Sequence, residues 1–331
     1  MIIPPGIAAL PRFGLIDGPS PLAPLRRFSA ALGGGAEVWI KREDLLPLAF
    51  GGNKLRNLEF LVGAALAAGA DTLITSGRRW SNHARLTAAA GARAGLAVHL
   101  VLTGPPPAAG EVGPNQRLDE LLGAIVHVTA TDDRAERSAL VEQLAAEARV
   151  AGRHPFVIGV GGTGPVGAAG QVLAGLEAAD QLAAAGVGGA TIVLPSATGG
   201  TQAGVLTGVS LGSPPIHDVA GIAVGSPAAD LRPTILGLLD GLTELIGLRV
   251  PDERVVLDDD QLGEGYGRPT EAADEAARLL ARTEGILVDP IYTAKALAGL
   301  VARVRDGRLS GPVVFWHAGG TPGIFESLAV T

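Results

Sequence analysis

The sequence predicts an α/β protein in which mostly parallel sheets are covered by helices on both faces. Short β-branched runs alternate along most of the chain with longer alanine-rich segments of helical periodicity, and this alternation is typical of strand–helix–strand units. The length of 331 residues corresponds to about two domains of average size. No repeat of about 20 to 50 residues is present, which excludes a solenoid.

The first half of the chain begins the alternation. Its short apolar runs predict strands at Glu37 to Arg42, Thr72 to Thr75, Val98 to Leu102, Ile125 to Val128 and Phe156 to Val160. Helical periodicity lies between most of them, at Leu58 to Ala68, Ala84 to Ala94, Asn115 to Leu122 and Arg134 to Ala151. The Pro- and Gly-rich segment Pro105 to Gly113 is predicted to be a surface loop.

The second half continues the same alternation with longer helices. Strands are predicted at Thr191 to Leu194, Val219 to Val224 and Val313 to Trp316. Helices are predicted at Pro165 to Ala185, Leu231 to Leu245, Thr270 to Thr283 and Thr293 to Asp306. Because parallel strands need such crossovers, we expect open sheets with ligand-contacting loops at the carboxyl ends of the strands.

Composition excludes several kinds of chemistry. The chain has no Cys, which removes disulfides, thiolate metal sites and cysteine nucleophiles. No pair of His residues has metal-ligand spacing, so we expect no catalytic metal. A net charge of −7 and few aromatic residues, with 3 Trp, 2 Tyr and 7 Phe, argue against nucleic acid as a partner.

Two long uncharged stretches, Pro155 to Leu176 and Gln181 to Ile216, are long enough to suggest membrane spans. Both contain many Gly, Pro, Ser and Thr residues, which a packed α/β interior accommodates better than lipid does. We therefore expect buried strands and glycine loops, with no membrane partner. The first residues lack the pattern of a signal peptide, and we expect a cytoplasmic protein.

The segment Phe50 to Glu59 is the first of three that carry a chemical signal. A glycine pair precedes Asn53 and Lys54, and a helical pattern follows. A lysine at a helix start is electrostatically misplaced, because the helix dipole favours anions there and lowers the pKa of the amine. The pattern points to a reactive lysine beside a flat ligand, although a surface lysine has the same local sequence.

The segment Thr75 to Arg85 is the second. It follows a predicted strand and opens a helix with Ser81, Asn82 and His83. Free amide groups at a helix start bind a carboxylate or a ring oxygen. The alternative is that Ser81 or Asn82 simply caps the helix.

The segment Leu194 to Gly204 is the third. A strand runs into a turn rich in Ser, Thr and Gly, and a helix follows. Successive amide groups from Ala197 to Thr201 would form an anion-binding nest, to which Thr198 and Thr201 add hydroxyl donors. This pattern predicts a phosphate cup without a Walker lysine.

Two short motif matches do not carry a function. Gly159, Gly161 and Gly164 match a dinucleotide fingerprint, but the acidic residues that follow lie inside a predicted helix. A match to the nucleophile elbow around Ser210 lies at the end of a helical pattern instead of between a strand and a helix. His317 stands apart, because it ends the last predicted strand.

Six segments together resemble one family in order and spacing. They are Lys54 in GGNK, Ser81 to His83, Ser196 to Gly204, Tyr266 in GYGRPTEA, Asp289 to Leu300 and Phe315 to Phe325. The family is that of 1-aminocyclopropane-1-carboxylate (ACC) deaminase and D-cysteine desulfhydrase, which are fold type II pyridoxal-phosphate enzymes of the tryptophan synthase β-like superfamily. The resemblance implies two open, twisted α/β domains with the cofactor in the cleft between them. It also implies a homodimer, with residues 1–50 and 163–331 as the large cofactor-binding domain and 51–162 as the small one.

The resemblance also implies roles for single residues. Lys54 matches the lysine that bonds to the cofactor, and Asn82 matches the residue beside the ring hydroxyl. Thr293 matches the position near the pyridine nitrogen. The expected catalytic residues are Lys54, Ser81, Tyr266 and Tyr292. The expected cofactor-binding residues are Lys54, Asn53, Asn82, Ala197, Thr198, Gly199, Gly200, Thr201 and Thr293. The expected substrate-binding residues are Trp80, Arg79, Ser81, Asn82, His83, Tyr266 and Tyr292.

The implied reaction is abstraction of a Cα proton and β-elimination from a small amino acid, giving a keto acid and ammonia. Where the deaminase branch has Gln and Glu, this chain has His83 and Thr293, which favours the desulfhydrase branch. The alternatives are an L-cysteate sulfo-lyase, a ring-opening deaminase, a β-replacement enzyme and a cofactor-binding protein without turnover.

Several residues depart from the family pattern. Arg78, Arg79 and Trp80 replace a small, neutral run before Ser81, and Asn57 and Ala318 replace an expected lysine and threonine. An arginine at this place could receive a second anionic group of the substrate, while Trp80 would reshape the pocket. The alternative is that both arginines only cover the surface.

Overall fold

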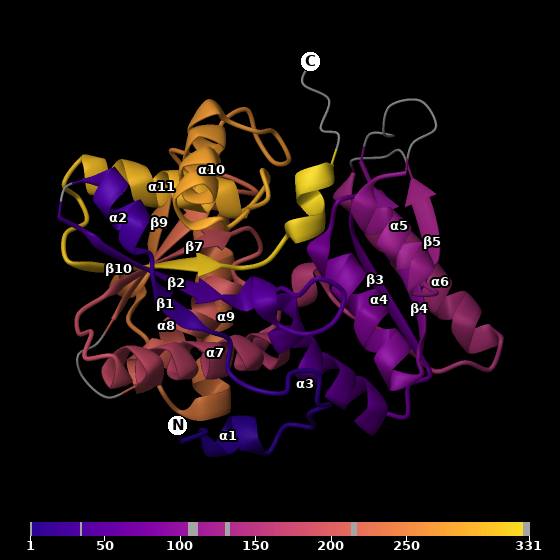
Figure 1. The fold of residues 1–331 in the computed structure, drawn as a ribbon. Helices are drawn as coiled ribbons and strands as arrows, with labels where there is room; N and C mark the ends of the chain where they lie inside the picture. Colours follow the sequence, from indigo (N-terminus) through magenta and orange to yellow (C-terminus); the bar gives the residue numbers. More distant parts are fainter. Residues whose placement is uncertain (1, 34, 105–111, 130–132, 213–216, 327–331) are drawn as a thin grey trace.

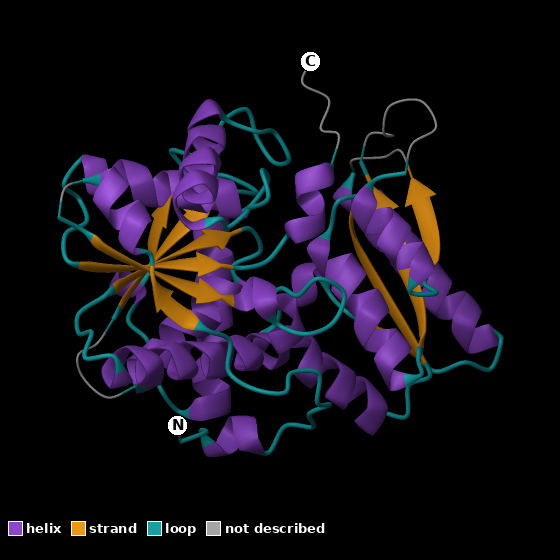
Figure 2. Ribbon diagram, viewed as in Figure 1, coloured by secondary structure: helices purple, strands orange, loops and turns teal. Residues whose placement is uncertain are grey.

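The computed structural model describes residues 2–33, 35–104, 112–129, 133–212 and 217–326 (Figure 1). Of the predicted surface loop, residues 105–111 lie outside these ranges. The described residues form two sheets, and the prediction of an α/β fold with mostly parallel strands is confirmed (Figure 2).

The larger sheet has six strands among the described residues, in the order β1-β2-β10-β7-β8-β9. The strands are β1 (Leu22–Pro24), β2 (Glu37–Arg42), β7 (Thr191–Ser196), β8 (Asp218–Ala223), β9 (Val256–Asp258) and β10 (Pro312–His317). Only β1 runs antiparallel to its neighbour; the other pairs are parallel.

The smaller sheet contains four described strands, all parallel, in the order β5-β4-β3-β6. They are β3 (Thr72–Arg78), β4 (Ala97–Thr103), β5 (Ile125–Thr129) and β6 (Pro155–Val157). All four lie within the predicted small domain, and the strands of the larger sheet lie within the predicted large domain. The exact domain limits stay a prediction.

Helices cover both faces of each sheet. The described α-helices are α1 (Pro5–Ala8), α2 (Arg26–Leu32), α3 (Lys54–Ala67), α4 (Asn82–Ala94), α5 (Pro114–Leu121), α6 (Arg134–Val150), α7 (Pro165–Ala184), α8 (Gly200–Leu211), α9 (Ala228–Ile246), α10 (Glu271–Glu284) and α11 (Thr293–Arg305). In the larger sheet, Val314 belongs to the core under α7, α8 and α9, while Val313 and Phe315 belong to the core under α2, α10 and α11. This alternation follows from the two-residue period of a strand.

Helices α3 and α7 pack against each other at the junction of the two sheets (Figure 1). Gly170 of α7 permits this close approach, because a Cβ atom there would lie 1.9 Å from the backbone oxygen of Arg56. The start of α3 is thereby held against α7, and Lys54 is the first residue of α3.

Some boundaries differ from the prediction. The strand expected at Phe156 to Val160 ends at Val157, because a 3-10 turn from Val160 to Gly162 follows it. Gly161 in that turn has a φ of 71°, which a strand does not allow. The three-residue strands β1 and β9 were not predicted, since so short a run has no readable periodicity.

Candidate active site

A cavity of about 690 Å³ opens at the carboxyl ends of strands from both sheets. Arg78 ends β3, Ser196 ends β7, and Ala318 and Gly319 follow β10; all four line the cavity. Most of the predicted site residues are brought together here, as further lining residues: Asn53, Lys54, Ser81, Asn82, His83, Ala197, Thr198, Gly199, Thr201, Tyr266, Tyr292 and Thr293.

A strained loop leads into Lys54. Leu48, Ala49 and Phe50 have positive φ angles of 71°, 44° and 66°, which side chains other than glycine rarely adopt. Gly51 follows, and a Cβ atom there would lie 2.1 Å from the backbone oxygen of Asp44. The loop turns the chain so that α3 begins at the cavity. Burial then lowers the pKa of Lys54 to about 8.

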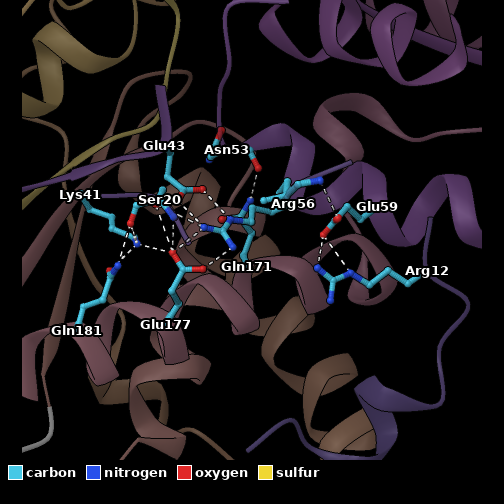
Figure 3. A network of polar contacts seen from close by, with 11 residues as sticks. Arg12, Ser20, Lys41, Glu43, Asn53, Arg56, Glu59, Gln171, Glu177 and Gln181 are labelled. Atoms are coloured by element: carbon cyan, nitrogen blue, oxygen red, sulfur yellow. Dashed lines mark hydrogen bonds and ion pairs between the residues drawn. The ribbon is translucent and has the colours of Figure 1, made fainter. Parts of the chain in front are cut away.

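A buried ionic network holds the first turn of α3 in place (Figure 3). Arg56 of α3 forms ion pairs with Glu43, at 2.8 Å, and with Glu177 of α7, also at 2.8 Å. Lys41 of β2 forms a third ion pair with Glu177. Burial opposes the charge on Glu177, but Arg56 and Lys41 hold the pKa of this carboxyl below its usual value. The network joins β2, α3 and α7.

The amines of the other two lysines are occupied. Lys41 is fully buried and donates to the backbone oxygen of Ser20 at 2.7 Å as well as to Glu177. Lys295 is fully buried too and donates to the backbone oxygens of Leu262 and Gly265 at 2.7 and 3.2 Å. Burial lowers the pKa of Lys295 to about 8. Neither amine lines the cavity, so position rather than pKa distinguishes Lys54.

Helix α4 points its amino-terminal end into the cavity. Ser81 is its N-cap, and the Oγ atom accepts a hydrogen bond from the amide of Ala84 at 3.1 Å. The amides of Asn82 and His83, in the first turn, have no partner within the helix. The Asn82 Oδ1 atom accepts from Asn115 and Arg85 at 3.3 and 3.4 Å, which leaves its NH₂ group for the cavity.

Hydrogen bonds define the tautomer of His83. Thr75 donates its hydroxyl hydrogen to the backbone oxygen of Ile158 at 2.8 Å, so Thr75 must accept from the His83 Nε2 atom, 3.0 Å away. The Nδ1 atom of His83 is buried and has no partner among the described residues. Burial and the charge of Lys54 lower the pKa of His83 to about 3, so the ring is a neutral acceptor.

The turn between β7 and α8 has free hydroxyl hydrogens. Thr198 accepts a hydrogen bond from Thr163 at 2.6 Å, and Thr201 accepts one from Asn53 at 2.8 Å. Each threonine therefore keeps its own hydrogen for a ligand. The buried Oγ atom of Ser196 has no partner among the described residues. Together with the first amides of α8, these groups suit a phosphate.

Asp289 organises the start of α11. Its Oδ1 atom accepts from the amides of Ile291 and Tyr292, and its Oδ2 atom accepts from the amide and the hydroxyl of Thr293. Thr293 thus uses its hydroxyl hydrogen on Asp289 and faces the cavity only as an acceptor. The sequence pattern includes Asp289, but its function as an anchor was not predicted.

The two tyrosines of the chain meet in the cavity. Tyr266 and Tyr292 are joined by a hydroxyl–hydroxyl hydrogen bond. Burial raises the pKa of both phenols, so both are neutral near pH 7. Trp80 does not line the cavity and instead packs its ring edge-on against Tyr266, with the centroids 5.9 Å apart.

Of the two arginines that the sequence offered for the pocket, Arg78 lines the cavity and Arg79 does not. Arg79 is outside the cavity lining and donates to the backbone oxygen of Gly104 at 3.2 Å. Arg78 lines the cavity, joined by Arg134 and Arg137 of α6, which were not predicted. Gly200 also lies outside the lining, as the first residue of α8.

His317 does not reach the cavity. It is fully buried, and its Nε2 atom lies 2.8 Å from the backbone oxygen of Leu287. Within the described ranges, no group of three or more His, Asp or Glu side chains could hold a metal ion. In the same part of the chain, no helix is both long and apolar enough to cross a membrane.

Comparison with known proteins decides the family. Residues 14–319 match the model of a family described as pyridoxal-phosphate dependent enzymes. The chain belongs to this family. The enzyme shares 38% identity with a crystal structure of an ACC deaminase homologue, at a TM-score of 0.88, with 97% of this chain and 95% of that chain covered.

More distant structures share the fold of the enzyme. One is a pyridoxal 5'-phosphate-dependent aspartate racemase, with 18% identity, a TM-score of 0.67 and 94% and 93% of the two chains covered. Another is threonine deaminase isoform 2 from Solanum lycopersicum, with 19% identity, a TM-score of 0.66 and coverage of 95% and 82%. These similarities confirm the fold type II prediction, and the cofactor of the enzyme is pyridoxal phosphate.

The residues of the cavity fit this cofactor. Its aldehyde needs an amine of low pKa, and its phosphate needs donors without other partners. Lys54 meets the first requirement, and Ser196, Thr198 and Thr201 meet the second. The NH₂ group of Asn82 suits a ring hydroxyl, and the acceptor on Thr293 suits a ring nitrogen that carries hydrogen.

Proposed function

We propose that the enzyme is a lyase that removes the Cα proton of a small amino acid and eliminates its β-substituent. One water is consumed, and the products are a keto acid, ammonia and the released substituent. The observation that carries this proposal is the meeting of Lys54, at a pKa of about 8, with the phosphate cup, the α4 amides and both tyrosines in one cavity. The similarity of the chain to the ACC deaminase homologue supports a deaminating reaction.

Lys54 holds the cofactor and moves the Cα proton. With a pKa of about 8, a useful fraction of its amine is neutral at pH 7, as both bond formation with an aldehyde and proton abstraction require. The bound cofactor supplies an electron sink for the negative charge that develops at Cα. Lys54 is the only lysine side chain among the described lining residues, so it serves as the base.

The start of α4 binds the α-carboxylate of the substrate. The unpaired amides of Asn82 and His83 and the positive end of the helix dipole suit a single carboxylate. Since the Ser81 Oγ atom already accepts from Ala84, its hydrogen is free to point at the same carboxylate. These contacts orient Cα toward Lys54.

The tyrosine pair donates a proton to the departing group. Of the two hydroxyl hydrogens of Tyr266 and Tyr292, one lies in the bond between them and the other is free. Because both phenols stay neutral, the free hydrogen can be donated to a leaving group at Cβ. This supports β-elimination of the D-cysteine desulfhydrase type.

Ring opening, as the name of the ACC deaminase homologue suggests, is the second candidate. The residue near the ring nitrogen favours elimination instead, because Thr293 is a neutral hydroxyl where a carboxylate would stabilise the charged ring more strongly. The holoenzyme is tested with D- and L-cysteine and with 1-aminocyclopropane-1-carboxylate. Pyruvate with sulfide from a cysteine supports elimination, 2-oxobutyrate supports ring opening, and no keto acid from either, or from a wider amino-acid screen, overturns the proposal.

Two further expectations remain proposals. The resemblance implies a homodimer, and light scattering of the purified holoenzyme should give twice the mass of one chain. A monomer at micromolar concentration contradicts this. The cytoplasmic location also remains a prediction, which fractionation of the source cells tests.

A further inference from the structure

One wall of the cavity is basic and takes no part in the reaction proposed above. Arg78 at the end of β3 and Arg134 and Arg137 in the first two turns of α6 line it, together with Ser138. The guanidinium of Arg78 lies over the ring of Tyr266, 5.9 Å from its centroid. This basic wall therefore lies beside the tyrosine pair, where the substrate side chain would extend.

Arg137 is the least satisfied member of the wall. It is half-buried, and its buried Nε atom has no hydrogen-bond partner among the described residues. Burial and the charges of Arg78 and Arg134 lower the pKa of Arg137, so its surroundings oppose its charge. A guanidinium that has lost water without gaining a partner is costly, and an anion offsets that cost.

The two carboxylates among the described lining residues, Asp230 and Asp289, do not supply this anion. Asp289 is bound by the first residues of α11, and Asp230 is exposed in the first turn of α9. Neither is among the groups that act electrostatically on Arg137; Arg78 and Arg134 are, and the third such group, Tyr266, is neutral near pH 7.

Three places in the cavity attract anions, but the cofactor and a neutral amino acid bring only two. The cup at α8 suits the cofactor phosphate, and the start of α4 suits the α-carboxylate. Within the basic wall, Arg137 is left over. We propose that the substrate is an amino acid whose side chain carries a second oxyanion, and that Arg137 binds it. A sulfonate on Cβ would leave as sulfite, whereas a carboxylate would have to belong to a leaving group that is bonded to Cβ through sulfur or oxygen.

This inference deepens the proposed function and rests on it for the placement of the α-carboxylate. Arg137 is the anchor, because a guanidinium binds two oxygens of one oxyanion with parallel hydrogen bonds. Arg134 and Arg78 add positive charge around the same group, while the Ser138 hydroxyl is already donated to the backbone oxygen of Arg134 at 2.9 Å. A side chain ending in a thiol or a hydroxyl would leave the Arg137 Nε atom without a partner.

The test compares two amino acids that differ only in the substituent on Cβ. The holoenzyme is titrated with the L- and D-forms of serine and of cysteate, and binding is followed by the absorbance of the cofactor. Aspartate replaces the sulfonate with a carboxylate in a third arm. The variants are Arg137→Gln and Arg137→Lys, with Arg149→Gln as the matched control, since Arg149 is exposed in the last turn of the same helix.

We expect the wild type to bind cysteate or aspartate more tightly than serine. Arg137→Gln should weaken binding of the acidic ligand by about 10- to 100-fold, and Arg137→Lys should weaken it less. Serine binding should change by less than about twofold in every variant, which also shows that the variants fold. Arg149→Gln should leave both affinities unchanged.

The inference is overturned if Arg137→Gln weakens the binding of serine and of cysteate equally, or if it changes the affinity for neither. So does a wild type that prefers serine and loses no affinity for cysteate in any variant. Keto acid formed from neutral amino acids alone, with no dependence on Arg137, rejects the inference and keeps the proposed function. If cysteate binding depends on Arg137 but no amino acid gives a keto acid, the result supports the Arg137 site and rejects the proposed function.

Discussion

Lys54 differs from Lys41 and Lys295 in what surrounds its amine, and we propose that this difference makes it reactive. Lys41 and Lys295 donate to carboxylate and carbonyl oxygens, whereas the Lys54 amine faces the cavity. Burial without a counter-charge is the cause of its lowered pKa.

The rate of cofactor uptake should therefore depend on pH in a characteristic way. Only the neutral amine attacks an aldehyde, so the rate at which the apoenzyme recombines with pyridoxal phosphate should rise with pH and level off above about 8. An unperturbed lysine would instead give a rise that continues to about 10.4. Stopped-flow absorbance across this pH range measures it, with Lys54→Arg as a control that forms no such bond.

Residues in motifs could be predicted from the sequence, and residues brought in by tertiary packing could not. Ser81 and Thr201 lie at helix starts that follow strands, so their position in the cavity could be predicted from the sequence pattern. Arg137 lies on a helix whose sequence looks like that of any surface helix. The choice between Arg78 and Arg79 depended on where β3 ends, which a sequence pattern locates only within a few residues.

At the scale of elements, the α8 turn is a phosphate cup only if its threonines keep their hydrogens for the ligand. Replacing both Thr198 and Thr201 by Val should raise the dissociation constant of the cofactor by about tenfold or more, because two donors to a charged group are lost. Equilibrium dialysis of the apoenzyme with pyridoxal phosphate measures this constant.

The control for the cup is Thr207→Val in the same helix. Thr207 donates to the backbone oxygen of Ala203 at 2.8 Å and does not line the cavity. Its replacement should leave the dissociation constant unchanged. An unchanged constant in the double variant as well would show that the phosphate lies elsewhere.

The network around Arg56 holds α3 to α7 and β2. Arg56→Met should lower the free energy of unfolding by about 3 to 5 kcal/mol, because Glu43 and Glu177 would be left with fewer counter-charges in a buried place. Urea unfolding measures the change. Arg305→Met breaks the exposed pair with Glu275 and should cost at most about 1 kcal/mol. Similar losses for the two variants would contradict a special importance of the network.

At the scale of the whole molecule, the cavity joins two sheets, each with its own core. Cofactor at about 100 times its dissociation constant should stabilise the enzyme by about 2.7 kcal/mol. Calorimetry should show a rise in Tm of roughly 5 °C over the apoenzyme, with both sheets melting in one transition. Inorganic phosphate alone should give a smaller rise. Two separate transitions, of which the cofactor shifts only one, would show that it binds a single sheet.

The fold class and the alternation of elements could be predicted because parallel sheets require strand and helix periodicity to alternate along the sequence. The strand order could not be predicted. β10, near the end of the chain, inserts between β2 and β7, a pairing across nearly the whole sequence that local periodicity does not encode. This insertion brings Ala318 and Gly319 to the cavity beside Asn53.

Covalent attachment of the cofactor to Lys54 is the central claim, and reduction of the holoenzyme with borohydride tests it most directly. The chain has three lysines, at positions 41, 54 and 295. Because the reduced bond survives proteolysis, peptide mapping by mass spectrometry locates it. We predict the label on the peptide that contains Lys54, and none on this peptide in the Lys54→Arg variant. Label on Lys41 or Lys295 in the wild type would contradict the account.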